Sequence, residues 1–145
     1  MAGILTLSPV LGHISLYYQT YPDEYVDNEL YAHLLRTLLG QVRGNLVLVH
    51  DGGTMHKGPP IRAVQADYPR LHLHPFPPYA PELNPVEYVW TDVKSHRLAN
   101  FVPQNTAQIE EAVCIELEDI RDDQDRLRSY FSSSPLPWNN TTLLF

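Results

Sequence analysis

The chain has 145 residues, a formal net charge of −7 and a pI near 5.3. This length suits one domain, and a hydrophobic fraction of 43% is ample for a core, so global disorder is excluded. The acidic balance excludes a surface that coats nucleic acid generally, because phosphate binding needs an excess of Lys and Arg, although a local basic groove stays compatible with it. A single cysteine, Cys114, excludes an intramolecular disulfide and a cysteine-based zinc site, and suits a reducing compartment.

Membrane and export signals are not found in the sequence. The first residues lack the charged segment that opens a secretory signal peptide. No apolar run approaches the roughly 20 residues that cross a bilayer. We therefore expect a soluble cytoplasmic protein with no membrane partner.

Hydrophobic periodicity predicts a chain that alternates between strands and helices, which is an α/β pattern. In the first helix, Asp27 or Asn28 is expected to act as the N-cap. In the second helix, Ile61, Val64 and Ala63 are expected to face inward. The predicted strands span residues 4–7, 13–19, 46–49 and 71–74, and the predicted helices span 26–42, 59–67, 85–98 and 105–128.

The last predicted helix carries a long acidic run that we interpret as a solvated face. Asn105 and Gln108 form a capping-box pattern at its start. One apolar face is expected to be made by Ile109, Val113, Leu117, Ile120 and Leu127. We expect a domain of residues 1–131 and a loop-like C-terminal tail of residues 132–145.

An acid follows the most apolar strand of the chain. Leu46–Val49 is an unbroken run of Leu and Val, typical of a strand buried on both faces of a parallel sheet. It leads into His50, Asp51 and two glycines. An acid at the carboxyl end of such a strand lies where open α/β sheets place their sites. The alternative for Asp51 is a turn-forming Asp-Gly pair.

A second acid follows a proline-rich loop. The stretch Pro77-Pro78-Tyr79-Ala80-Pro81-Glu82-Leu83-Asn84-Pro85-Val86-Glu87-Tyr88-Val89-Trp90 predicts a stiff loop that leads into a helix. Asn84 is a suitable N-cap and Pro85 suits the first helical position. Glu87 then lies on the first turn, where the helix dipole favours an ionised carboxylate. Dipole complementation alone is the simpler interpretation of Glu87.

Two carboxylates that converge can hold hard divalent cations through oxygen ligands, as Mg²⁺ prefers. Two such ions about 3.5–4 Å apart can support cleavage or transfer of a phosphodiester. A different metal site is conceivable from His50, His56, His72 and His74, which together could bind zinc, but their spacing matches no familiar zinc pattern.

The run Leu48-Val49-His50-Asp51-Gly52-Gly53-Thr54-Met55-His56-Lys57, taken with the proline loop and the helix through Lys94, resembles the DDE endonuclease domain of IS630/Tc1/mariner-type transposases. The resemblance is to the bacterial IS630 branch and covers at least residues 4–101. The Pro-x-Tyr-x-Pro-x-Leu-Asn-Pro-x-Glu-x-x-Trp signature is its most specific part. The spacer of 35 residues between Asp51 and Glu87 suits that branch.

This resemblance implies an RNase H-like fold, in which a mixed sheet is flanked by helices. It implies that Asp51 and Glu87 are the second and third catalytic acids and ligate Mg²⁺ or Mn²⁺. It further implies that DNA, as transposon ends and target, is the partner. His56 and Lys57 are expected to lie near DNA, and polar loop residues are the alternative. Trp90 is expected to pack its helix onto the sheet.

One departure from the family concerns the first catalytic Asp, which the resemblance places on a strand upstream of residue 4. No acid before Asp51 lies in a suitable element, so we expect a domain that lacks the first strand and is inactive alone. The expected function is that of the C-terminal part of a DDE transposase, which cleaves and transfers DNA strands. The alternative is a non-catalytic subunit that pairs with itself or with a full-length transposase, or a decayed fragment.

Overall fold

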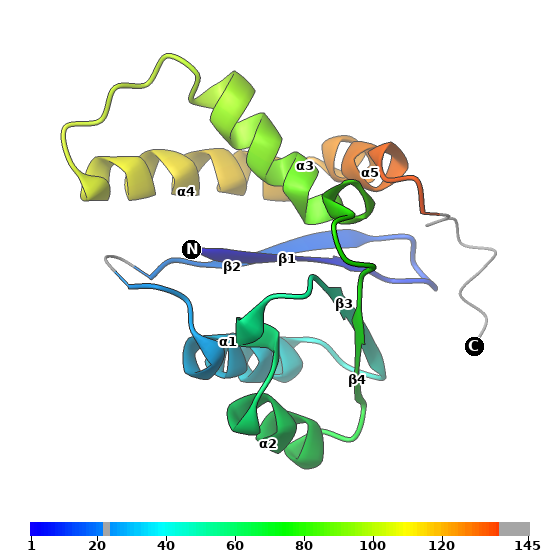
Figure 1. Ribbon diagram of the computed structural model, residues 1–145. Coiled ribbons are helices and arrows are strands. Elements are labelled where there is room, and N and C mark those ends of the chain that lie inside the picture. The colour runs from blue at the N-terminus through cyan, green and yellow to red at the C-terminus, as the bar shows by residue number, and fades with distance from the viewer. Residues whose placement is uncertain (22–23, 137–145) are drawn as a thin grey trace. The chain divides into compact units, whose positions relative to one another are not determined.

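A computed structural model of the chain describes residues 1–21 and 24–136 (Figure 1). Within these residues the chain is a mixture of strands and helices, which confirms the predicted α/β class. It divides into two compact units. Unit 1 takes its residues from 1–23 and 82–145, and unit 2 spans residues 24–81.

Unit 1 begins with an antiparallel hairpin. Strand β1 (Ala2–Leu7) pairs with β2 (Ile14–Gln19), with Leu7 opposite Ile14 at the turn end. Gly12 closes the turn with φ of 63°, a left-handed conformation that a side chain disfavours. Both strands were predicted from the sequence.

Helices lie over one face of this hairpin, as Figure 1 shows for α3, α4 and α5. Helix α3 (Pro85–Asp92) continues into a π-helical turn, η3 (Val93–Arg97), so the predicted helix of residues 85–98 has the expected extent. Helix α4 (Thr106–Asp122) and helix α5 (Gln124–Ser133) complete the layer. The core between hairpin and helices consists of Ile14, Leu16, Val89, Val93, Leu117, Ile120, Leu127, Tyr130 and Phe131.

The prediction of one helix over residues 105–128 was wrong, because Asp123 ends one helix and begins the next. Its backbone is non-helical (φ −100°, ψ 94°), and its carboxylate accepts a hydrogen bond from the Arg126 amide at 3.0 Å. A short acid competes with the helical ladder in this way. The expected inward position of Ile109 was also wrong, since that side chain is 43% exposed.

Only one of the two hydrogen bonds of the predicted capping box forms at the start of α4. Asn105 accepts from the Gln108 amide at 2.9 Å, as expected. The Gln108 side chain accepts from the amide of Gln104 rather than that of Asn105. At the other end, α5 runs to Ser133, so the segment expected as a tail from residue 132 begins as helix. Residues 137–145 of that expected tail lie outside the described residues.

Unit 2 consists of α1 (Asn28–Gln41), β3 (Leu46–His50), a 3₁₀ turn η1 (Thr54–His56), α2 (Pro59–Asp67) and β4 (Leu71–Pro75). Asp27 caps α1, as one of two predicted candidates. Ile61 and Val64 are buried as predicted, whereas Ala63 is exposed, contrary to expectation. The buried apolar side chains of this unit include Leu34, Leu35, Leu38, Leu39, Leu48, Ile61, Val64, Leu71 and Phe76.

Strands β3 and β4 pair in parallel, with Leu46 opposite Leu71. The parallel pairing agrees with the prediction for Leu46–Val49, but burial on both faces does not. Leu48 is 8% exposed, whereas Val47 is 61% exposed. The two neighbouring residues thus differ in burial, so apolar composition alone overstated the burial of this strand.

The described strands form two separate two-stranded sheets, β1–β2 and β3–β4. A single ribonuclease H-type sheet stays a prediction. In the described part of the chain no helix is both long enough and apolar enough to cross a membrane.

Candidate metal centre

Asp51 is the first residue after β3, at the carboxyl end of that strand, where the sequence placed it. Its side chain is 59% exposed. Two donors converge on one of its oxygens, Oδ1: the Gly53 amide at 2.8 Å and Nε2 of His56 at 2.9 Å. The Gly53 bond is the Asp-Gly turn that the sequence offered as the alternative for Asp51, so a turn and an exposed, ordered carboxylate occur together.

Gly53 is required for this close approach. A Cβ at position 53 would lie 2.8 Å from Oδ1 of Asp51 and 3.4 Å from Cδ2 of His56. The first distance is shorter than any ordinary van der Waals contact, so a larger residue would displace the carboxylate or the turn. The second glycine after Asp51 therefore lets three groups meet at one point.

His56 is buried beneath this turn, with 8% of the residue exposed. Its ring meets the edge of Tyr31 from α1 at a centroid distance of 4.4 Å, and lies 4.6 Å from the ring of His50. Its second nitrogen, Nδ1, is buried and has no hydrogen-bond partner among the described residues. The His56 ring is thus held on two sides, and its one polar contact with the described residues is to Asp51.

The titration of these groups follows from burial. Burial lowers the pKa of His56, although the neighbouring Asp51 charge acts in the opposite direction. Burial also raises the pKa of Tyr31, and the Asp51 charge adds to that effect. Both shifts favour the neutral forms of the His56 and Tyr31 rings.

Lys57 is the exposed member of the pair expected near DNA. Its ammonium group donates to the carbonyl oxygen of Gly52 at 3.2 Å. The side chain therefore folds back over the turn that carries Asp51. This arrangement places one positive charge close to the candidate metal ligand.

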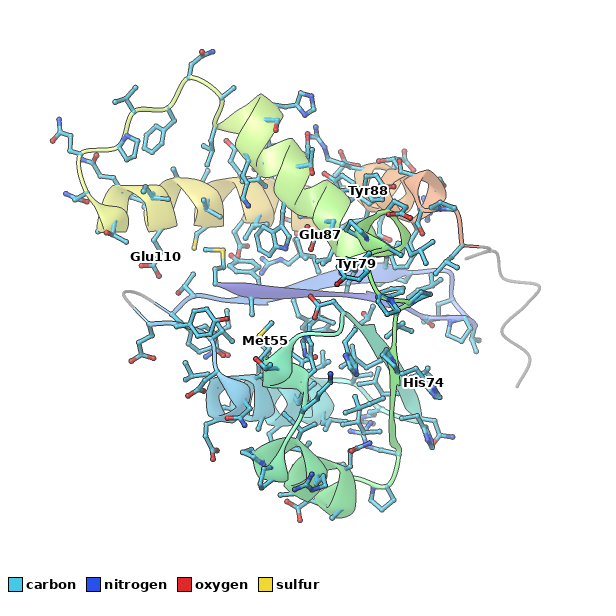
Figure 2. All side chains as sticks on the ribbon, in the orientation of Figure 1. Met55, His74, Tyr79, Glu87, Tyr88 and Glu110 are labelled. Atoms are coloured by element: carbon cyan, nitrogen blue, oxygen red, sulfur yellow. The ribbon has the colours of Figure 1, made fainter. Side chains whose placement is uncertain are left out.

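Glu87, in unit 1, lies on the first turn of α3 as predicted (Figure 2). Asn84 caps the helix by accepting from the Val86 amide at 3.3 Å, and Pro85 occupies the first helical position. The Glu87 side chain is exposed. Its carboxylate is therefore accessible to a cation from solvent.

The loop that leads into α3 is held by two hydrogen bonds from side chains. The hydroxyl of Tyr88 donates to the Glu82 carbonyl at 3.0 Å, and buried Ser134 donates to the Leu83 carbonyl at 2.9 Å. Trp90 packs against β1, because a Cβ on Gly3 would lie 2.8 Å from its ring. The sequence predicted the packing of Trp90 but gave no sign that the end of α5 would hold the loop.

The proline loop contains a strained residue that sequence reasoning did not identify. Tyr79 has φ of 58°, the one left-handed residue other than glycine in the described chain, and its side chain is fully exposed. Bulky residues rarely adopt this conformation. The sequence carried no signal for it, because the prolines restrict their own φ and the residue directly before each of them, and Tyr79 is neither.

The search for larger metal-binding clusters covers the described residues, the Asp51 turn included. Across residues 1–21 and 24–136, no group of three or more His, Cys, Asp or Glu side chains is placed to hold a metal ion. His72 and His74 are exposed on β4, and His50 and His56 are near the Asp51 turn. The zinc alternative therefore gains no support from the described histidines.

Comparison with known families defines the class to which this α/β chain belongs. The family model described as DDE superfamily endonuclease matches residues 15–109, well over half of the chain. The chain belongs to this family. None of the curated proteins searched matches it. The matched region includes both Asp51 and Glu87.

Family membership supports a nuclease or transposase type of function and implies a DNA substrate. The family generally depends on divalent metal ions. Carboxylate oxygens are ligands of the kind that such hard cations prefer, and both Asp51 and Glu87 are exposed. The residues present therefore fit the metal that the family implies. The convergence of the two acids on one centre stays a prediction.

Proposed function

We propose that this chain is part of the catalytic domain of an IS630-type transposase and that Asp51 and Glu87 together hold Mg²⁺ or Mn²⁺ at a DNA phosphodiester. The reaction class is cleavage of a DNA strand and its transfer to a new site. In this proposal Asp51 and Glu87 are the second and third acids of the family's triad.

The observation that carries this proposal is that the Asp51 carboxylate is both exposed and held by hydrogen bonds. It stands exposed at the end of a strand, while its Oδ1 atom is fixed by two donors. An acid that served only to close a turn would need one donor, from the backbone. The buried histidine beneath it is a second support that favours a fixed ligand.

Glu87 supports the same proposal from the other unit. It extends from a helix whose start is fixed by a cap, a proline and two hydrogen bonds to the preceding loop. When bound, divalent ions would polarise the phosphate and favour attack by water or a 3′-hydroxyl. The role of Asp51 and Glu87 is to hold ionised oxygens in place, and Lys57 would attract the DNA backbone.

Iron-directed backbone cleavage tests whether the two acids share a centre. Fe²⁺ that replaces Mg²⁺ generates hydroxyl radicals with ascorbate and peroxide, and these cut the chain next to the ion. We expect cuts near both residue 51 and residue 87, suppressed by excess Mg²⁺. Asp51→Ala and Glu87→Ala should each remove both cuts, whereas Glu111→Ala, an exposed acid on α4, should leave them. Cuts at one site alone, or cuts that survive both changes, would reject the shared centre.

A second candidate function is that of a non-catalytic subunit, and the free edge of β3 favours it. The Leu46 amide donates to the Arg70 carbonyl, and the Phe76 amide donates to the His50 carbonyl. Leu46 and His50 therefore direct their backbone groups toward β4. By alternation, the backbone groups of Val47 and Val49 point to the opposite edge, which no strand covers in the described sheets. On β4 the outer edge carries Pro75, which has no N–H to offer.

Such an edge can pair with a second copy of this chain or with a full-length transposase. Light scattering coupled to size exclusion would detect a dimer of the chain. Val49→Pro should abolish the dimer, because it removes an N–H from the free edge of β3. The control is Val49→Thr, which keeps the N–H. A chain that is monomeric at all concentrations and binds no full-length enzyme would reject this function.

A further inference from the structure

The hydrogen bond between His56 and Asp51 is more than a packing contact. We propose that His56 is a positioning residue whose Nε2–H holds Oδ1 of Asp51, so that the carboxylate presents its other oxygen, Oδ2, to the divalent cation. This inference rests on the proposed function, because it assumes that Asp51 is a metal ligand.

The distribution of donors distinguishes the two oxygens of Asp51. Both the Gly53 amide and the His56 ring reach Oδ1, at 2.8 and 2.9 Å. Within unit 2, the two donors to the Asp51 side chain both go to Oδ1, and none of the described residues of that unit donates to Oδ2. A cation that binds the carboxylate through Oδ2 therefore displaces no hydrogen bond, whereas one that binds through Oδ1 competes with two. Asp51 is prepared for ligation through one oxygen.

The position of the His56 proton follows from the same geometry. An ionised carboxylate only accepts hydrogen bonds, so Nε2 must carry the proton. Nδ1 is buried without a partner among the described residues, and a proton there would be an unsatisfied buried donor. The neutral ring with its proton on Nε2 is therefore the form that fits this position.

The ring itself has little freedom to turn. Tyr31 meets it from α1 and His50 from the end of β3. The 3₁₀ turn of residues 54–56 is closed by the Lys57 amide, which donates to the Thr54 carbonyl at 3.1 Å. Packing against two other elements of unit 2 thus fixes the donor that fixes Asp51. Partners that orient a metal ligand in this way commonly change metal affinity by 10- to 100-fold when removed.

Two substitutions of His56 separate the hydrogen bond from the packing. His56→Phe keeps a ring between Tyr31 and His50 but removes the donor. His56→Gln places an amide N–H close to the position of Nε2 and so restores the donor. His74→Phe removes an exposed histidine of β4 from the same unit and serves as the matched control.

The experiment measures Mn²⁺ binding to the full 145-residue chain by electron paramagnetic resonance, with thermal unfolding of each variant as the check on folding. We expect His56→Phe to weaken Mn²⁺ binding by about tenfold or more, and His56→Gln to recover most of the loss. His74→Phe should bind as the wild type does. A merely structural role for His56 would lower the melting temperature of both His56 variants and would show no recovery with Gln.

A second readout needs no metal. Nitrogen-15 NMR of the histidine rings should show His56 with its proton on Nε2, and Asp51→Ala should shift that resonance. A proton on Nδ1 would overturn the proposal.

The possible failures are distinguishable. Equal Mn²⁺ affinity in the wild type and in Asp51→Ala would overturn the proposed function. Loss of binding in Asp51→Ala together with unchanged affinity in His56→Phe would overturn the positioning role alone.

Discussion

Trp90 lies so close to Gly3 that a single added carbon on Gly3 would be 2.8 Å from the indole ring. This contact joins α3, the helix that carries Glu87, to strand β1. Gly3→Ala should therefore lower the free energy of unfolding by about 1–3 kcal/mol, the usual cost of inserting a methyl group into a packed interface. Urea denaturation measures the change.

Gly40→Ala is the matched control for this prediction. Gly40 is in α1, and a Cβ there would meet nothing within 4 Å. The same substitution should raise the free energy of unfolding by about 0.5–1 kcal/mol, because Ala is the better helix former. If both glycines respond alike, the Trp90 contact is not the cause.

Asp92 joins three helical segments of unit 1. Its Oδ2 atom accepts from the Tyr130 hydroxyl at 2.7 Å and pairs with Nε of Arg126 at 3.1 Å, and its Oδ1 lies 3.3 Å from His96. The carboxylate is only 15% exposed. Tyr130→Phe should cost about 1 kcal/mol, and Asp92→Ala should cost more, because it leaves the Tyr130 hydroxyl and the Arg126 guanidinium without their acceptor.

A double-mutant cycle between Asp92 and Tyr130 measures the coupling directly. The comparison pair is Arg128 and Asp125, which are in contact at 2.9 Å but have side chains 55% and 96% exposed. That pair should contribute less than about 0.5 kcal/mol. Coupling of equal size in the two cycles would show that the Asp92 network is no stronger than a surface ion pair.

The start of the Glu87 helix was predictable because local chemistry determines it. Asn84 and Pro85 restrict the backbone whatever the rest of the fold does, and α3 begins there. Asp51 was located for a similar reason, since an Asp-Gly pair directly after an apolar strand is typical of a turn at the end of that strand. The role of His56 was not predictable, because it depends on Tyr31, a residue distant in the chain that packs against it.

The wrong predictions share one physical origin. Asp123 is one of several acidic residues in this stretch, and nothing in the sequence distinguishes it from the others. The helix is interrupted there because its carboxylate accepts a hydrogen bond from the Arg126 amide. Val47 is as apolar as Leu48, yet it faces outward because no element of its unit covers that side of β3. Periodicity reports what a side chain prefers, whereas burial depends on what the rest of the chain places against it.

Alkaline pH should weaken the fold through Tyr18. Burial, followed by a hydrogen bond to Glu118, raises the pKa of this phenol to about 12. A raised pKa means that its stabilising contribution is complete below pH 10, the ordinary value for tyrosine, and is lost as the pH rises toward 12. Tyr18→Phe should show a smaller fall in unfolding free energy over that interval, measured by denaturant titration at each pH. Tyr25→Phe, an exposed tyrosine, should follow the wild type.

A cross-linking experiment tests the spatial meeting of Asp51 and Glu87 without metal or activity. Cys114 is the single cysteine, so Cys114→Ala gives a background free of thiols. In that background, Asp51→Cys with Glu87→Cys should be joined rapidly by a short bis-maleimide, because two residues that share a cation must have side chains close together. Asp51→Cys with Glu111→Cys is the matched pair, and its cross-linking should be much slower. Mass spectrometry of the digested chain identifies the linked peptides. Equal rates for the two pairs would place Glu87 no nearer to Asp51 than an acid on α4. That result would reject the proposal that Asp51 and Glu87 share a cation.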